Sequence, residues 1–228
     1  MMLKAIIFDL DETLTDRRAA INSFIERLIA RYFPDSDEDT QLMIAKRFKE
    51  ADHNGYRDKH EVYEMLVKHL RWVNPPTADE YLSFFRKEIP LCIQPMDQLF
   101  PVLRELKTWG LKLGIITNGT VQVQEGKIHQ LGIREYFDSI VISEEAGVKK
   151  PDPAIFTRVL NRLNVMSSEA WYVGDHPRND IIGAAQSGIK PIWFTRDGNW
   201  DYSEEVKPYR TIHRLEELIR IYTEHYES

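Results

Sequence analysis

The chain has 228 residues, which at about 150 residues per domain corresponds to one large domain or one domain that carries an insertion. Apolar residues make up 43% of it, and with the 11 glycines added this share is typical of globular proteins, which excludes a disordered or fibrous chain. The 36 acidic and 30 basic residues give a net charge of −6, which argues against binding to a nucleic-acid polymer or a membrane surface.

Short apolar runs without helical periodicity alternate with helical patterns along the chain, and such runs are typical of strands buried on both faces of a parallel sheet. The expected strands are residues 3–10, 111–117, 139–143, 170–174, 191–195 and a weaker one near 211–212. The expected helices of this part are residues 96–109, 121–131, 153–164, 179–187 and 214–225. This alternation predicts an α/β fold with a parallel sheet.

The alternation is interrupted once, after the first strand. Residues 16–92 hold no convincing strand pattern and instead show apolar positions at helical spacing, with breaks at 33–35, 53–55 and 74–76. Because the chain begins with a strand, a separate N-terminal helical domain is disfavoured. We therefore predict an α/β core of residues 1–15 and 93–228, with an inserted helical cap over residues 16–92.

The single cysteine, Cys92, excludes an intrachain disulfide and a cysteine zinc cluster, and we do not expect it to be a catalytic thiol. The apolar run at the N-terminus meets acidic residues after a few positions, so it is too short for a signal peptide or a membrane span. A cytoplasmic protein is the resulting expectation, and the sequence is silent on its oligomeric state.

Two carboxylates, Asp9 and Asp11, close the first predicted strand. In open α/β sheets, ligands bind beyond the carboxyl ends of the strands, and residues two apart in an extended chain share a face. Such a pair repels unless a cation or a shared proton separates the charges, and Mg²⁺, which prefers oxygen ligands, meets that need. Taken alone, the pair is more often the beginning of an ordinary loop. An EF-hand is rejected, because Leu14 and Ala20 stand where that loop needs glycine and glutamate.

The other predicted strands deliver further polar groups to the same edge. The second ends in Thr117 and Asn118, and the helix after it offers backbone amides to an anion. Lys150 follows the third strand, and Asp175 and Asp180 follow the fourth. Taken one by one, the polar residues could simply cap a helix, and the lysine could simply be solvated. These explanations account poorly for the whole set at one edge. Together they predict a site where acids hold a cation and Thr, Asn and Lys hold a phosphate.

These motifs, in this order, resemble those of the haloacid dehalogenase superfamily over nearly the whole chain. The motifs are DLDET, ITNG, KKPDP and GDHPRND. The insertion directly after the first motif resembles a C1-type helical cap, and residues 137–150 resemble phosphatases of subfamily IA, which includes pyrimidine 5′-nucleotidases and phosphoglycolate phosphatases. The resemblance implies a Rossmann-like parallel sheet with helices on both faces, plus an inserted all-helical cap.

The resemblance also implies how the residues would act in catalysis. Asp9 is the expected nucleophile, which forms an aspartyl phosphate, and Asp11 is the expected general acid and base. Thr117 and Lys150 are expected to hold the phosphoryl oxygens, and Asn118 is expected to add a contact. The acid at position 11 implies a phosphoesterase or a phosphotransferase, because true dehalogenases of the superfamily lack it.

Mg²⁺ is the cofactor that the resemblance implies. Asp9 and Asp175 are expected to bind it by their carboxylates and Asp11 by its backbone carbonyl. Asp180 is expected behind these ligands or in contact through a water molecule.

The sequence thus predicts a Mg²⁺-dependent phosphatase of small phosphorylated metabolites. A phosphotransferase or mutase with the same residues stays open as an alternative, and so does a catalytically silent, phosphate-binding regulatory protein. Nucleoside monophosphates, phosphoglycolate and sugar phosphates stay open as substrates. Residues 52–59 form a polar break between two predicted helices of the cap. Two interpretations of this break, together with Arg17 and Arg18, carry equal weight: it faces the leaving group of the substrate, or it is an ordinary solvated loop.

Overall fold

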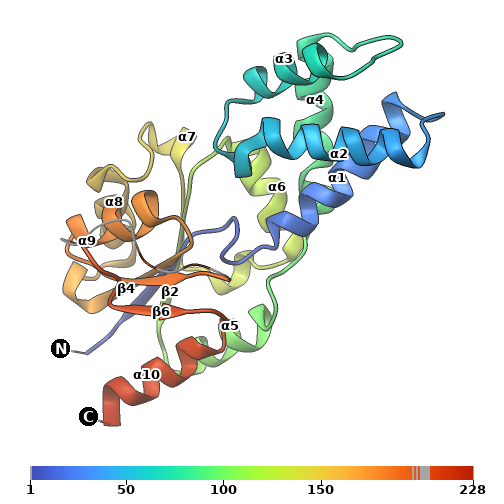
Figure 1. The fold of residues 1–228 in the computed structure, drawn as a ribbon. Coiled ribbons are helices and arrows are strands. Elements are labelled where there is room, and N and C mark those ends of the chain that lie inside the picture. The colour runs from blue at the N-terminus through green and yellow to red at the C-terminus, as the bar shows by residue number, and fades with distance from the viewer. Residues whose placement is uncertain (1, 197, 199, 201–205, 228) are drawn as a thin grey trace. The chain divides into compact units, whose positions relative to one another are not determined.

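The computed structural model describes residues 2–196, 198, 200 and 206–227 (Figure 1). The chain forms two compact units: the core unit, residues 1–16 with 94–228, and the helical unit, residues 17–93. These bounds differ by one residue from the predicted ones. Over the described residues, no helix is both long and apolar enough to span a membrane.

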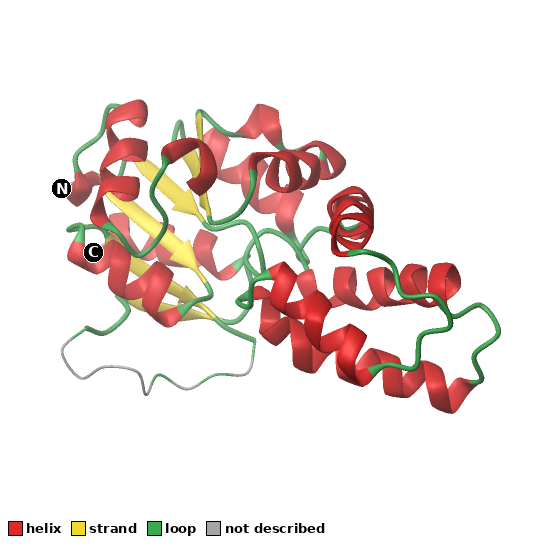
Figure 2. Ribbon diagram, turned by 90° about the horizontal axis from the view of Figure 1, so that it is seen from above, coloured by secondary structure: helices red, strands yellow, loops and turns green. Residues whose placement is uncertain are grey.

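The core unit is built on a parallel sheet, which has six strands within the described residues, in the order β3-β2-β1-β4-β5-β6. The strands are β1 (Ala5–Phe8), β2 (Lys112–Thr117), β3 (Ser139–Ile142), β4 (Ala170–Gly174), β5 (Lys190–Phe194) and β6 (Arg210–Ile212). Each neighbouring pair is parallel, so the arrows in Figure 2 point the same way. This is the Rossmann strand order, and the predicted fold class is confirmed.

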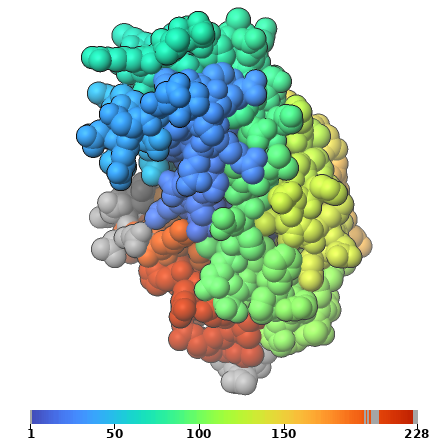
Figure 3. Space-filling model, turned by 90° about the vertical axis from the view of Figure 1, so that its right-hand side faces the viewer, coloured from blue at the N-terminus to red at the C-terminus, as the bar shows by residue number. Residues whose placement is uncertain are grey.

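Helices cover both faces of this sheet. Figure 1 shows α8 (Pro153–Leu163) and α9 (Gly183–Gln186) on one face, with α5 (Leu99–Thr108) and α10 (Glu217–Glu227) on the other. The side chains of α5 and α10 lie side by side in Figure 3, and the ring of Trp109, at the C-terminal end of α5, stacks 4.1 Å from the ring of Tyr222 in α10. The remaining helices of the core unit are α6 (Val121–Leu131), α7 (Ser143–Ala146), η3 (Arg134–Tyr136), η4 (Ser167–Glu169) and η5 (Pro177–Ile182).

One predicted helix of the core unit has a different form. The segment expected as a helix over 179–187 begins at Pro177 as the π-helical turn η5 and continues as α9. It begins earlier because Nδ1 of His176 accepts hydrogen bonds from the backbone N–H groups of Arg178 and Asn179.

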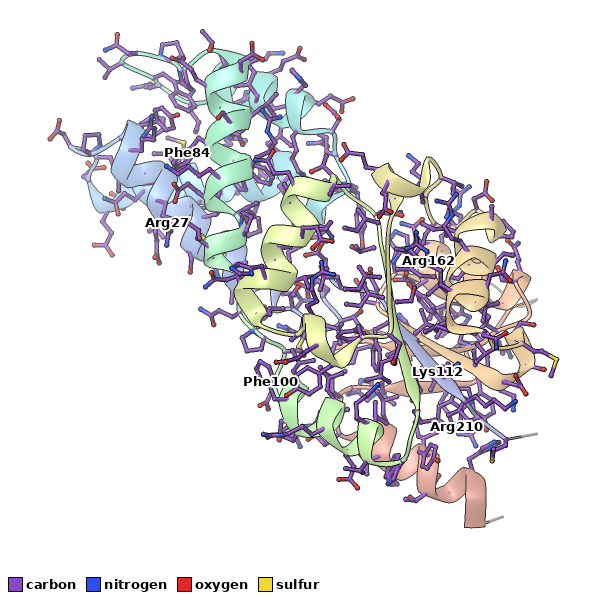
Figure 4. The ribbon with its side chains drawn as sticks, turned by 180° about the vertical axis from the view of Figure 1, so that it is seen from behind. Arg27, Phe84, Phe100, Lys112, Arg162 and Arg210 are labelled. Atoms are coloured by element: carbon purple, nitrogen blue, oxygen red, sulfur yellow. The ribbon has the colours of Figure 1, made fainter. Side chains whose placement is uncertain are left out.

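Helix α8 shows why the local sequence folds as it does. Asp152 caps its first turn by accepting from the N–H of Ala154, Pro153 takes the first helical position, and Asn164 ends it in a left-handed conformation. Lys112 and Arg162 tie its last turn to the sheet by donating to the carbonyls of Leu163 and Ile140 (Figure 4). Its buried face packs on the sheet through Ile155, Phe156, Val159, Leu160 and Leu163.

The helical unit consists of helices separated at the predicted breaks. They are α1 (Arg17–Tyr32), α2 (Glu38–Asp52), η1 (His53–Gly55), α3 (Lys59–His69), α4 (Ala78–Glu88) and η2 (Pro90–Cys92). The ring of Phe24 packs against three other aromatic rings, those of Phe48, Phe84 and Phe85, at centroid distances of 5.1–5.5 Å. Figure 4 shows Phe84 on α4 and Arg27 on α1, and Arg27 pairs with Glu88 at 2.6 Å. The unit therefore has an apolar core of its own.

Replacing Phe156 tests the packing of α8 on the sheet. Phe156→Ala should lower the free energy of unfolding by about 3–5 kcal/mol, because the cavity lies in a fully buried cluster. Met166→Ala, at an exposed side chain of the same unit, should change it by less than about 0.5 kcal/mol. Urea unfolding measures both, and equal effects would contradict the described packing.

Candidate active site

Three carboxylates from different parts of the core unit meet at one edge of the sheet. Asp9 directly follows β1, Asp175 directly follows the neighbouring strand β4, and Asp180 lies in η5. One oxygen of each lies within 4.8 Å of one oxygen of the other two. Asp9 and Asp180 are buried, so water screens their mutual repulsion only weakly.

The ammonium group of Lys150 lies buried among these acids. Its Nζ donates to Oδ1 of Asp9 and to Oδ1 of Asp180, each at 2.6 Å, and to the hydroxyl of Tyr172 at 3.0 Å. The Tyr172 hydroxyl in turn donates to Oδ1 of Asp180. All three N–H donors of the ammonium therefore have acceptors, which is what a buried lysine requires.

The pKa values show that this ammonium offsets the negative charge only in part. Burial raises the pKa of Asp9 to about 7 against the opposing effect of Lys150, and the charge of Asp180 adds to the rise. Burial also raises the pKa of Asp175 well above its ordinary range, and the charges of Asp180 and Asp9 raise it further. Burial alone would lower the pKa of Lys150, but the two carboxylates beside it raise it instead. The site therefore keeps an excess of negative charge that a cation would relieve.

Asp180 is held in a fixed orientation by protein donors on both oxygens. Oδ1 accepts from Lys150 and Tyr172, and Oδ2 accepts from the backbone N–H of His176 at 2.9 Å. Gly174 makes room for it, since a Cβ at that position would lie 2.5 Å from Cγ of Asp180. The close approach of Asp180 thus explains why the fourth motif has glycine at this position.

Asp11 is bound by two residues of α6 that sequence reasoning missed. Nζ of Lys127 lies 2.7 Å from both carboxylate oxygens of Asp11, and Nε2 of Gln124 donates to Oδ2 at 3.1 Å. The Gln124 amide also donates to the hydroxyl oxygen of Thr117, the last residue of β2. The available signal was their spacing, because residues three apart share one face of a helix.

Asn118 contacts the Lys150 loop. Its Nδ2 donates to the carbonyl of Lys150 at 3.1 Å, and its Oδ1 accepts from the N–H of Lys150 at 2.9 Å. This reciprocal pair joins the end of β2 to the segment that precedes α8. The sequence-based expectation for Asn118 was a phosphate contact, which stays a prediction.

Comparison with known proteins agrees with this geometry. The model of the haloacid dehalogenase-like hydrolases matches residues 6–194. The chain belongs to this family. It is 31% identical to the glyceraldehyde 3-phosphate phosphatase of Methanopyrus kandleri, over 98% of each chain. It is 30% identical to the pyrimidine 5′-nucleotidase YjjG of Escherichia coli, over 96% of this chain and 98% of that protein.

A solved structure of the same fold is that of the HAD-hydrolase YfnB from Bacillus subtilis, bound to magnesium. It has a TM-score of 0.80 at 22% identity and covers 97% of this chain and 99% of that chain. With the relatives named above, the expected phosphatase branch of the superfamily is confirmed, and the chain is an enzyme of that branch.

Two other residues of this hydrolase, His176 of the fourth motif and the single cysteine, are accounted for by their structural surroundings. His176 uses its ring to cap η5, and burial lowers its pKa. Cys92 is a buried free thiol whose pKa is raised by burial, which disfavours the reactive thiolate.

The polar break at 52–59 is ordered around a buried acid of the helical unit. Asp52 accepts from Arg17 at 2.8 Å and from Lys59 at 2.9 Å. His53 and Asn54 both adopt left-handed conformations, which non-glycine residues rarely do. The side chain of Tyr56 is exposed.

The buried Lys150 of the hydrolase should contribute strongly to stability. Lys150→Met should lower the free energy of unfolding by about 3–5 kcal/mol at pH 8 without divalent cations, since it leaves buried carboxylates uncompensated. The loss should be smaller at pH 5.5, because a protonated Asp9 no longer needs the ammonium.

The matched control is Lys107→Met, which removes a partly exposed pair with Asp138 in the same unit. It should cost less than about 1 kcal/mol. Denaturant unfolding at both pH values measures these effects, and equal losses for the two variants would contradict the described role of Lys150.

Proposed function

We propose that this hydrolase is a Mg²⁺-dependent phosphatase, which cleaves small phosphate monoesters through an aspartyl phosphate on Asp9. The observation that carries the proposal is the buried Lys150 ammonium beside Asp9, with Asp175 and Asp180 at the same sheet edge. The carboxylates can bind a cation and the neighbouring ammonium can interact with a phosphate. Both kinds of group lie next to Asp9, the candidate nucleophile.

The donor set fits Mg²⁺. The residues that would hold it are Asp9 and Asp175 through their carboxylates and Asp11 through its backbone carbonyl, all oxygen ligands of the kind that Mg²⁺ prefers. The raised pKa values of Asp9 and Asp175 indicate uncompensated charge at these two positions. Asp180, whose oxygens are occupied by protein donors, is better suited to orient Lys150 and the loop after β4. Bound there, Mg²⁺ would offset the negative charge that the phosphoryl group brings to the acids.

Asp9 and Asp11 would divide the chemistry between them. A carboxylate oxygen of Asp9 forms a bond to phosphorus as the bond to the leaving oxygen breaks, and Asp11 donates a proton to that oxygen. Asp11 then takes a proton from a water molecule, which attacks the aspartyl phosphate and releases phosphate with Asp9 restored. Both residues stand beyond β1, so one short segment supplies both groups.

Thr117 would bind a phosphoryl oxygen through its hydroxyl, and Lys150 would do so by exchanging one of its present acceptors. The Thr117 hydroxyl oxygen accepts from Gln124, so its own proton can point to a phosphoryl oxygen. Lys150 adds positive charge at the nucleophile, which reduces the repulsion between Asp9 and an approaching phosphate. Asn118 would act by holding the backbone of Lys150, and its direct contact with phosphate is secondary in this proposal.

The helical unit is proposed to be the cap that excludes water and selects the substrate. The names of the relatives support a small phosphorylated metabolite, since one acts on a triose phosphate and another on pyrimidine nucleotides. We place the enzyme in the cytoplasm, where a lone, buried thiol such as Cys92 stays reduced.

Asp9→Asn tests the nucleophile. Phosphate release should fall by roughly 10³-fold or more while the far-UV circular dichroism stays unchanged, because an amide cannot form the aspartyl phosphate. The control is Asp138→Asn, at a partly exposed acid of the same unit, which should keep full activity.

The assay tests a panel of phosphate monoesters with Mg²⁺: nucleoside monophosphates, sugar phosphates and phosphoglycolate. Both products of hydrolysis, the inorganic phosphate and the alcohol released from the ester, are quantified. Undiminished turnover by the Asp9 variant would refute the nucleophile. Transfer of phosphate to a second alcohol would favour a phosphotransferase.

Asp175→Asn tests the metal site independently of turnover. Without divalent cations the variant should unfold at a temperature equal to or above that of the natural protein, because it lacks a half-buried carboxylate that Asp9 and Asp180 repel. Mg²⁺ should stabilise the natural protein, by about 2.7 kcal/mol at 100 times its Kd, and stabilise the variant much less. Calorimetry with a Mg²⁺ titration measures both, and an equal Mg²⁺-induced shift in the two proteins would exclude Asp175 as a ligand.

A further inference from the structure

We propose that Gln124 and Lys127 are positioning residues, which hold the Asp11 carboxylate in the orientation needed for proton transfer. The inference rests on the proposed function, in which Asp11 serves as general acid and base. It assigns to helix α6 a part in the chemistry beyond the backbone amides at its N-terminus.

The contacts define the orientation of Asp11 closely. Nζ of Lys127 lies 2.7 Å from each carboxylate oxygen, Nε2 of Gln124 donates to Oδ2 at 3.1 Å, and the Thr15 hydroxyl lies 3.5 Å from Oδ1. Asp11 itself stands in a turn after β1, where the next residue, Glu12, has a left-handed φ of 59°. The backbone N–H groups of Leu14 and Thr15 close this turn by donating to the carbonyl of Leu10, but these bonds do not set the side-chain torsions of Asp11. Side-chain contacts are what orient its carboxylate.

The burial of the two donors supports a specific role. Lysine is almost never buried unless it is paired, yet only 6% of Lys127 is exposed, and 2% of Gln124. Both side chains lie on the same face of α6, three residues apart. An ordinary solvated helix face would place them in water instead.

Gln124 links the proposed acid to the proposed phosphate site. Its two amide N–H donors serve Asp11 and Thr117, so the proton donor and the phosphate-binding hydroxyl share one support. The glycine of the ITNG motif makes this possible, because a Cβ at Gly119 would lie 2.9 Å from Cγ of Gln124. The second motif and α6 therefore form one positioning unit around Asp11.

A comparison of substrates with different leaving groups can distinguish this positioning role from a purely structural one. An alkoxide leaving group needs a proton as the bond to phosphorus breaks, whereas 4-nitrophenolate leaves with little assistance. General-acid catalysis is worth about 10²–10⁴-fold, and displacement of a catalytic group by about 1 Å can cost about 10²-fold. A misplaced Asp11 should therefore slow alkyl phosphates far more than an aryl phosphate.

The experiment compares kcat/KM for 4-nitrophenyl phosphate with kcat/KM for the alkyl phosphate that the natural enzyme in the panel above turns over fastest. This parameter reports the first phosphoryl transfer, in which Asp11 acts as an acid. Lys127→Met should lower kcat/KM for the alkyl phosphate at least about 10-fold more than for the aryl phosphate, and Lys127→Arg should recover part of the loss. Gln124→Met should act in the same direction and gives the same comparison if Lys127→Met fails to fold.

Two controls make the result decisive. Gln130→Met, at an exposed position of the same helix, should leave both values unchanged. Asp11→Asn should show the strongest preference for the aryl phosphate. Equal losses for both substrates in the Lys127 and Gln124 variants, or no loss, would overturn the positioning role while leaving the proposed function intact. Equal losses in Asp11→Asn would overturn the acid role of Asp11, and this inference with it.

Discussion

The buried ion pairs of Lys150 with Asp9 and Asp180 are the interaction on which the rest of the site depends. The parallel sheet gathers three carboxylates at one edge, where burial makes their repulsion costly. One ammonium with two contacts of 2.6 Å lets the acids stay together, but it does not balance all of their charge. The same arrangement thus permits the fold and leaves negative charge at the sheet edge, which a bound cation would offset.

The supporting contacts follow from the strand order. Because β1 lies between β2 and β4, the residues that follow these three strands lie close together. Residues at the end of one strand therefore support residues at the end of another. Asn118 after β2 holds the backbone of Lys150, and Gly174 at the end of β4 makes room for Asp180. A substitution at Asn118 or Gly174 would disturb Lys150 or Asp180, and through them the proposed nucleophile Asp9.

The net charge of the chain and the charge at the site are separate matters. A charge of −6 argues against a polyanionic partner, since long-range fields scale with the whole charge distribution. At the sheet edge, however, the local field depends on groups within a few ångströms. Lys150 and Lys127 lie there, in direct contact with Asp9 and Asp11, the two acids to which we assign the chemistry. An acidic protein of this kind can therefore bind an anionic substrate.

The sequence by itself determined the alternation of strands and helices, the helical insertion and the order of the four motifs. Apolar runs, caps and breaks act over a few residues, so they can be read without the fold. Only the tertiary structure decided that Lys127 reaches Asp11 across 116 positions, that the Tyr172 hydroxyl serves Asp180, and that Asn118 binds the Lys150 loop. These contacts depend on how α6 and the loops pack against the sheet edge, and no local pattern encodes the distance between side chains so far apart in the chain.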